Sequence, residues 1–237
     1  MTLPLVLSHG VIESSESWAP LLPHLAAAFE VITPDARGRG ASPVPPEPIG
    51  YAELAADMQA LTEERGLGRI FHAGHSMGGR VAMEHALAHP DSVRSIAVIS
   101  ARAEAPDEAG RARLREQAEI SRRLGPGEAV GLWTQPDDPY YERVRSISAR
   151  NSAEGTAAAL ECLARMESLA PRLPELCIPV LVVAGDGDQA YVRSAKLMAA
   201  AIPEAELRIL PGVGHFPNLE CPQLLAKLLE EFFLAHR

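Results

Sequence analysis

The chain has 237 residues, of which 47% are hydrophobic and 22% charged, so it can bury one substantial core and form one domain with an insertion. Its formal net charge of -9, without any basic stripe, argues against nucleic acid as a partner. The cysteines (Cys162, Cys177 and Cys221) are odd in number and form no C-x-x-C pair, which disfavours a disulfide framework or a zinc site and fits a reducing cytoplasm. The first residues lack a basic leader, and their apolar run is too short to span a bilayer, so we expect no membrane association.

Short apolar runs alternate with helical patterns over the first hundred residues. Leu3 to Ser8 predicts a buried strand, and the His9-Gly10 loop after it should open at the sheet edge where α/β folds bind ligands. Turn-rich sequence and a proline cluster occupy residues 35–48. The patterns predict further strands at 31–33 and 93–100, and helices at 18–29, 51–66 and from residue 77 to about 89.

The composition changes between residues 101 and 171, where arginine and glutamate are dense and no strand-like run occurs. We predict a helical cap there, inserted into a core formed by residues 1–100 and 172–237. Beyond the cap the patterns predict strands at 179–184 and 206–210, and helices at 191–202 and 222–235. This order indicates an α/β fold with a mostly parallel sheet, helices on both faces and a lid above its C-terminal edge.

The segment Gly74-His75-Ser76-Met77-Gly78 lies between a predicted strand and a predicted helix, which is typical of a nucleophile elbow. A Cβ on either flanking glycine would collide with the neighbouring strand or helix. Ser76 is therefore the candidate nucleophile. The helix that follows directs its N-terminal amides towards the place where an oxyanion would form.

A serine hydroxyl needs a base, and the base needs a group that orients it. His215 lies in a glycine-rich loop after the last predicted strand, and Asp188 follows the strand before it. The order serine, acid, histidine suits this elbow type. Asp186 and Glu104 remain alternative acids. The backbone amides of Met77 and Val11 are the expected oxyanion hole.

Five segments together resemble the α/β-hydrolase superfamily, and within it small esterases and 3-oxoadipate enol-lactone hydrolases. They are Leu7-Ser8-His9-Gly10, residues 35–42, Gly74 to Gly79, Gly185 to Asp188 and Gly214-His215-Phe216-Pro217. The resemblance spans nearly the whole chain and implies the same roles for Ser76, Asp188, His215 and the two amides. Members commonly begin with a β-hairpin before the His-Gly strand, so we expect this sheet to be short by one or two strands at that edge, which raises the question of how the edge is covered.

The sequence allows two roles for several other side chains. Trp133, Tyr140 and Tyr141 in the cap either line the pocket or hold the lid together, and Arg80 and Trp133 are also similar to residues of the menaquinone-pathway lyase that eliminates pyruvate with the same triad. We treat Trp133, Tyr140 and Arg80 as candidate substrate-binding residues. His85 and His89 have the i, i+4 spacing of a metal pair but lack further ligands, which favours a structural or solvent-exposed role.

The expected function is serine hydrolysis of a carboxylic ester or lactone of a small to medium substrate through an acyl-enzyme. No metal or organic cofactor is expected. Alternatives are the pyruvate-eliminating lyase and, more distantly, a non-catalytic ligand receptor on the same fold. The sequence leaves open the acyl and alcohol groups and the oligomeric state, because specificity depends on the cap.

Overall fold

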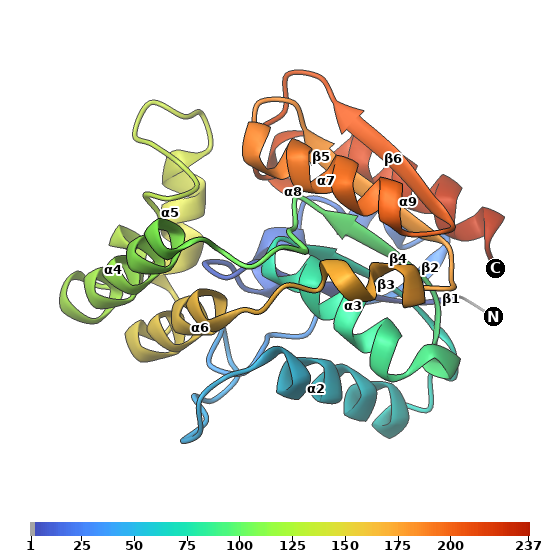
Figure 1. Cartoon of the computed structure of the whole chain (residues 1–237), viewed down its shortest axis with the longest axis horizontal. Coiled ribbons are helices and arrows are strands. Elements are labelled where there is room, and N and C mark those ends of the chain that lie inside the picture. The colour runs from blue at the N-terminus through green and yellow to red at the C-terminus, as the bar shows by residue number, and fades with distance from the viewer. Residues whose placement is uncertain (1–2) are drawn as a thin grey trace.

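A computed structural model describes residues 3–237 and contains one six-stranded sheet with the order β2-β1-β3-β4-β5-β6 (Figure 1). Every neighbouring pair of strands is parallel. The strands are β1 (Leu3–Ser8), β2 (Phe29–Ile32), β3 (Ile70–His75), β4 (Val93–Ile99), β5 (Val180–Gly185) and β6 (Ala205–Leu210). Buried apolar residues on both faces of β1, β3, β4 and β5 explain why parallel pairing is stable here, and the predicted α/β fold class is confirmed.

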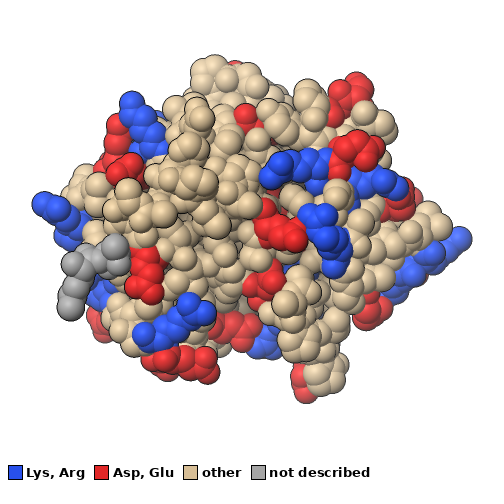
Figure 2. All heavy atoms as spheres, turned by 180° about the vertical axis from the view of Figure 1, so that it is seen from behind, with Lys and Arg blue, Asp and Glu red and all other residues tan. Residues whose placement is uncertain are grey.

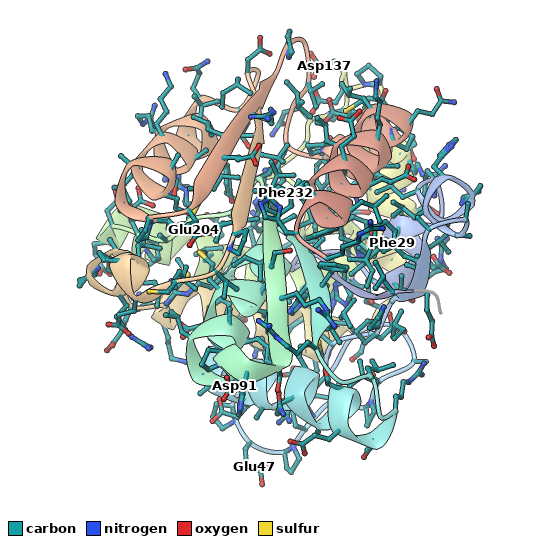
Figure 3. The ribbon with its side chains drawn as sticks, turned by 90° about the vertical axis from the view of Figure 1, so that its right-hand side faces the viewer. Phe29, Glu47, Asp91, Asp137, Glu204 and Phe232 are labelled. Atoms are coloured by element: carbon teal, nitrogen blue, oxygen red, sulfur yellow. The ribbon has the colours of Figure 1, made fainter. Side chains whose placement is uncertain are left out.

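Helices cover both faces of the sheet, as Figure 3 shows from the side. They are α1 (Leu22–Leu25), α2 (Tyr51–Glu64), α3 (Met77–Ala88), α7 (Gln189–Ala201), α8 (Pro217–Glu220) and α9 (Pro222–Ala235). On one face, Leu5 and Phe71 pack with residues of α1 and α9, including Phe233, whose ring stacks on Phe71 with 4.9 Å between centroids. On the other face, Val98 and Val182 pack with residues of α3 and α7. The carboxyl ends of the strands are thereby held as a rigid edge on which loops can carry functional groups.

The helix predicted over residues 18–29 is wrong in extent. A 3-10 turn (Ser15–Trp18) and the short helix α1 replace it, and β2 already begins at Phe29. Pro20 and Pro23 explain the difference, because a proline inside a helix removes a backbone donor and collides with the preceding turn. The apolar residues of this segment nevertheless have helical spacing because they pack on the sheet: Trp18, Leu21 and Leu25 are fully buried.

Three helices without an intervening strand connect β4 to β5, within the segment that the sequence predicts as a cap. They are α4 (Glu108–Leu124), α5 (Tyr141–Ala149) and α6 (Ala153–Arg165), and Figure 1 shows them together at one end of the molecule. Side chains cap two of them, since Asp107 accepts a hydrogen bond from the Gly110 amide (2.7 Å) and Ser152 accepts one from the Gly155 amide (3.1 Å).

Buried polar contacts connect these helices to the loop after β2. The Gly40 amide donates to the Asn151 side chain (2.8 Å), and the guanidinium of Arg39, fully buried, donates to the hydroxyl of Thr156 in α6. Arg39 also donates twice to the Glu13 carbonyl, at 2.9 and 3.1 Å. One side chain therefore fixes the cap to two loops of the core.

β2 forms one edge of the sheet, and no further strand pairs with it among residues 3–237. No helix in the same range is long and apolar enough to cross a membrane. Figure 2 shows one face of the molecule, on which basic and acidic residues are interspersed.

Candidate active site

The chain makes a very sharp turn at Ser76, between the end of β3 and the start of α3. Ser76 has φ 52° and ψ -113°, a conformation that costs free energy for any residue with a side chain. A Cβ on Gly74 would lie 2.1 Å from the Gly78 carbonyl oxygen, and one on Gly78 would lie 2.1 Å from the Ser8 carbonyl oxygen. The predicted steric need for both glycines is confirmed, because the helix and β1 approach the turn too closely for any side chain.

His215 and Asp188 meet above the same edge of the sheet. Asp188 directly precedes α7, His215 follows β6, and the His215 Nδ1 lies 2.8 Å from Asp188 Oδ2. The two alternative acids bind elsewhere, since Asp186 accepts the Gly212 amide (2.7 Å) and Glu104 accepts the Ser194 hydroxyl. Of the three candidates, Asp188 is the one that can orient the imidazole.

The charge state of His215 suits a general base. Burial lowers its pKa below the ordinary value, and the hydrogen bond to Asp188 offsets part of that change. The ring is therefore neutral at pH 7. With its Nδ1 proton donated to the carboxylate, its Nε2 keeps a lone pair that can accept a proton.

Ser76, Asp188 and His215 line one cavity of about 730 Å³ between the sheet edge and the cap. The Ser76 hydroxyl makes no direct hydrogen bond to His215 among residues 3–237, and the Tyr191 side chain lies close to it. The Tyr191 ring lies 4.4 Å from the His215 ring, centroid to centroid. In unliganded active sites the hydrogen bond between nucleophile and base is often long or absent and forms when the substrate binds.

The backbone amides of Val11 and Met77 are available as hydrogen-bond donors. Both residues are buried, and neither amide donates to a protein acceptor in the described part of the chain. Met77 is the first residue of α3, so its amide also lies at the positive end of the helix dipole. The Gly10 amide donates to Glu13 Oε2 at 2.7 Å, which fixes the loop that carries Val11.

A buried ion pair that the sequence analysis did not predict lies beneath the site. The His75 Nδ1 is 2.6 Å from Glu13 Oε2, and its Nε2 is 2.7 Å from the His215 carbonyl oxygen. Both acceptors lack protons, so both ring nitrogens must carry one and His75 is an imidazolium. Burial alone would lower the pKa of His75, but the charge and hydrogen bond of Glu13 raise it above the ordinary value.

Glu13 is held as a carboxylate by the same contacts. Burial alone would raise its pKa, but the charge and hydrogen bond of His75, with the amide of Asn218 at 3.0 Å, lower it to about 2. These partners lie 62 and 205 positions away along the chain. No spacing in the sequence could therefore have indicated this pair.

The three predicted substrate-binding residues all line the cavity, yet each also has a partner in the protein. The Trp133 indole donates to the Tyr191 hydroxyl (3.3 Å), and the Tyr140 hydroxyl donates to the Glu220 carbonyl (3.1 Å). Arg80 is almost fully buried and donates to Glu84 and to two backbone carbonyls. The cap aromatics thus line the pocket and hold the lid at the same time.

His85 in α3 takes part in structural contacts. His85 Nδ1 lies 3.3 Å from His72 Nδ1, and His85 Nε2 lies 3.2 Å from the Gln59 side-chain oxygen. Burial lowers the pKa of His85 to about 4, so the ring is neutral. No group of three or more metal-ligating side chains occurs among residues 3–237.

Comparison with known proteins agrees with this geometry. Residues 4–222 match the family model described as alpha/beta hydrolase fold. The 3-oxoadipate enol-lactonase 2 of Acinetobacter baylyi is 29% identical, with 95% of this chain and 86% of that protein aligned. A putative 2-succinyl-6-hydroxy-2,4-cyclohexadiene-1-carboxylate synthase of Bacillus subtilis is 26% identical, over 96% of this chain and 89% of its own length. A thermophilic esterase from Thermogutta terrifontis, solved with malate bound, superimposes with a TM-score of 0.91 at 29% identity, covering 100% of this chain and 92% of that one. The chain belongs to the α/β-hydrolase fold family.

Proposed function

We propose that the protein is a serine hydrolase that cleaves a carboxylic ester or lactone of a small to medium substrate. The observation that carries the proposal is the strained Ser76 turn in one cavity with the His215–Asp188 pair. The similarity to an enol-lactonase and to an esterase supports it. A cytoplasmic location is part of the same proposal and fits the absence of any cysteine pattern typical of disulfides.

The proposed chemistry follows from the charge states of the site. Neutral His215 accepts the proton of Ser76 as the hydroxyl oxygen attacks the substrate carbonyl. The oxyanion that forms is stabilised by the amides of Val11 and Met77. His215 returns the proton to the leaving alcohol, and water then hydrolyses the acyl-enzyme by the same path. None of these steps needs a metal or an organic cofactor.

Replacing the nucleophile tests the proposal. We expect Ser76→Ala to lower kcat for p-nitrophenyl esters by about 10⁴-fold or more, because the members of a triad act as a unit. The control is Ser146→Ala on the exposed side of α5, which should keep the activity of the parent. If Ser76→Ala retained most of the turnover while its urea unfolding matched the parent, another nucleophile would be responsible.

A lyase that eliminates pyruvate is the second candidate. It is favoured by the name of the Bacillus subtilis relative and by the position of Arg80 and Trp133 on the cavity wall. The two candidates differ in a direct assay. Release of pyruvate from the lyase substrate, without turnover of esters, would favour the lyase over the hydrolase.

A further inference from the structure

Two arginines face the cavity without a carboxylate partner. Arg102, just after β4, and Arg113 in α4 both line the cavity that holds Ser76. Neither forms an ion pair or a hydrogen bond with another described residue among 3–237. The Nε of Arg102 is buried and has no acceptor. A buried charged donor without an acceptor is costly, which indicates that a ligand supplies the acceptor.

Arg102 is held in place by an aromatic ring of the site itself. Its guanidinium carbon lies 5.1 Å from the centroid of the Tyr191 ring, a cation–π contact. The centroid of the same ring lies 4.4 Å from that of His215, and Tyr191 and Ser76 line the same cavity. Contact through the face of the guanidinium leaves its N–H edge available, in the cavity that Ser76 and His215 also line.

The acidic side chains around the cavity are already occupied. Asp188 binds His215, Glu220 accepts the amides of Gly214 (2.7 Å) and Phe216 (2.9 Å), and Asp138 accepts from Thr134 (3.0 Å) and from the Gln135 amide (2.6 Å). Glu104, two residues beyond Arg102, accepts the Ser194 hydroxyl. None of these carboxylates forms an ion pair with Arg102 or Arg113, so both guanidinium groups remain available to an anionic ligand.

We propose that this cavity binds a substrate with a free carboxylate, which Arg102 holds by hydrogen bonds from its N–H edge. The inference rests on the proposed ester hydrolysis and names its substrate class: a monoester or lactone of a dicarboxylic acid. A planar guanidinium matches a carboxylate in a two-pronged hydrogen bond, and a partly buried site strengthens the contact. Arg113, exposed at the rim, adds a second positive charge that attracts the anion.

A matched pair of esters tests the carboxylate. Mono-p-nitrophenyl adipate carries the charge, and p-nitrophenyl methyl adipate is nearly the same shape without it. We expect the parent to prefer the anionic ester in kcat/KM, and Arg102→Gln to lower kcat/KM for that ester by about 10- to 100-fold while the neutral ester changes by less than about 3-fold. The matched control is Arg123→Gln, an exposed arginine of α4 that does not line the cavity and should change neither value.

Equal losses on both esters in Arg102→Gln would overturn the proposal, as would a parent that prefers the neutral ester. A second measurement distinguishes failure of the carboxylate proposal from failure of the proposed ester hydrolysis. Calorimetry with adipate and with dimethyl adipate needs no turnover. Binding of adipate that is at least about tenfold tighter in the parent than in Arg102→Gln supports the anion site even if neither ester is cleaved, and equal or undetectable binding refutes it.

Discussion

At the scale of single residues, the Glu13–His75 ion pair joins three loops of the candidate site. Glu13 accepts the amide of Gly10 beside Val11, and His75 precedes Ser76 and donates to the carbonyl of His215. The position of all three groups thus depends on one buried pair of charges. Removing one partner of such a pair leaves the other charge uncompensated, which costs more than the pair itself contributes.

We expect Glu13→Gln to lower the free energy of unfolding by about 3–5 kcal/mol, because a glutamine cannot accept from His75, Gly10 and Asn218 together or balance the imidazolium. Urea denaturation measures this loss. The control is Glu16→Gln in the same loop, whose carboxylate is 51% exposed and paired with Arg150. The control should cost no more than about 1 kcal/mol. Equal effects of the two substitutions would contradict a special role for the buried pair.

The pH dependence of the free energy of unfolding should reflect the ionisation of the Glu13 carboxylate. The pKa of Glu13 is lowered from 4.5 to about 2, so its contribution is present above pH 4.5 and is lost as the pH falls towards 2. In urea titrations at several pH values, the parent should lose more stability over this window than Glu13→Gln does. Parallel curves for the two proteins would show that Glu13 is not a buried carboxylate.

At the scale of elements, the crossing of α6 over the loop after β2 depends on two glycines. A Cβ on Gly155 would lie 1.9 Å from the Gly38 carbonyl oxygen, and Gly38 itself has φ 77°. The first of these is a close approach between backbones, which no rotamer change can relieve. The two backbones can therefore come this close only where neither residue carries a side chain.

Gly155→Ala sets two effects against each other. Alanine favours a helix over glycine by about 1 kcal/mol, whereas forcing a methyl group into backbone contact costs about 1–3 kcal/mol or more. Because the atom met is a backbone oxygen, we expect the steric cost to win and the midpoint of urea unfolding to fall. Gly131→Ala, in a cap turn with no atom within 4 Å of the added methyl, should stay within about 0.5 kcal/mol of the parent. A stabilised Gly155→Ala would mean that α6 is not docked as described.

Prediction from the sequence succeeded for elements whose signal is local. The strands at Leu3–Ser8 and Val93–Ile99 and the helix at Pro222–Ala235 are continuous apolar or periodic runs, so their identity needs no distant partner. The prediction of one helix around Trp18 was wrong because two prolines prevent a continuous helix there. The apolar side chains keep helical spacing because they pack into the core. The candidate triad was predictable because its residues follow the ends of strands, and parallel strands bring their ends to one edge.

At the scale of the whole molecule, the cavity exists only because the cap docks on the core. Trp133 and Tyr140 reach across from the cap to Tyr191 and Glu220, and Arg39 reaches from the core to Thr156. Burial lowers the pKa of Arg39 to about 9, with Glu13 and Asp35 opposing that shift. The contact that docks the cap is thus the buried guanidinium of Arg39. Each of its donors needs an acceptor, because an unsatisfied buried charge is costly.

We expect Arg39→Lys to lower the free energy of unfolding by about 2–3 kcal/mol, because a lysine keeps the charge but cannot donate to the Glu13 carbonyl and Thr156 from one planar fork. Arg150→Lys provides the comparison, since Arg150 also joins cap to core but its side chain is 54% exposed. That change should cost less than about 1 kcal/mol. If Arg39→Lys left the free energy of unfolding unchanged, apolar contacts alone would dock the cap.

The sequence by itself determined the fold class, the strained serine turn and the order of the candidate triad, because each depends on residues close together in the chain or on the shared edge of parallel strands. Only the tertiary structure decided that Asp188 rather than Asp186 faces His215, that Glu13 and His75 form a buried ion pair, and that Arg102 faces the cavity without a partner. The physical reason is that pairing and burial are properties of side chains that fold together from distant positions, and no local pattern encodes which charges meet.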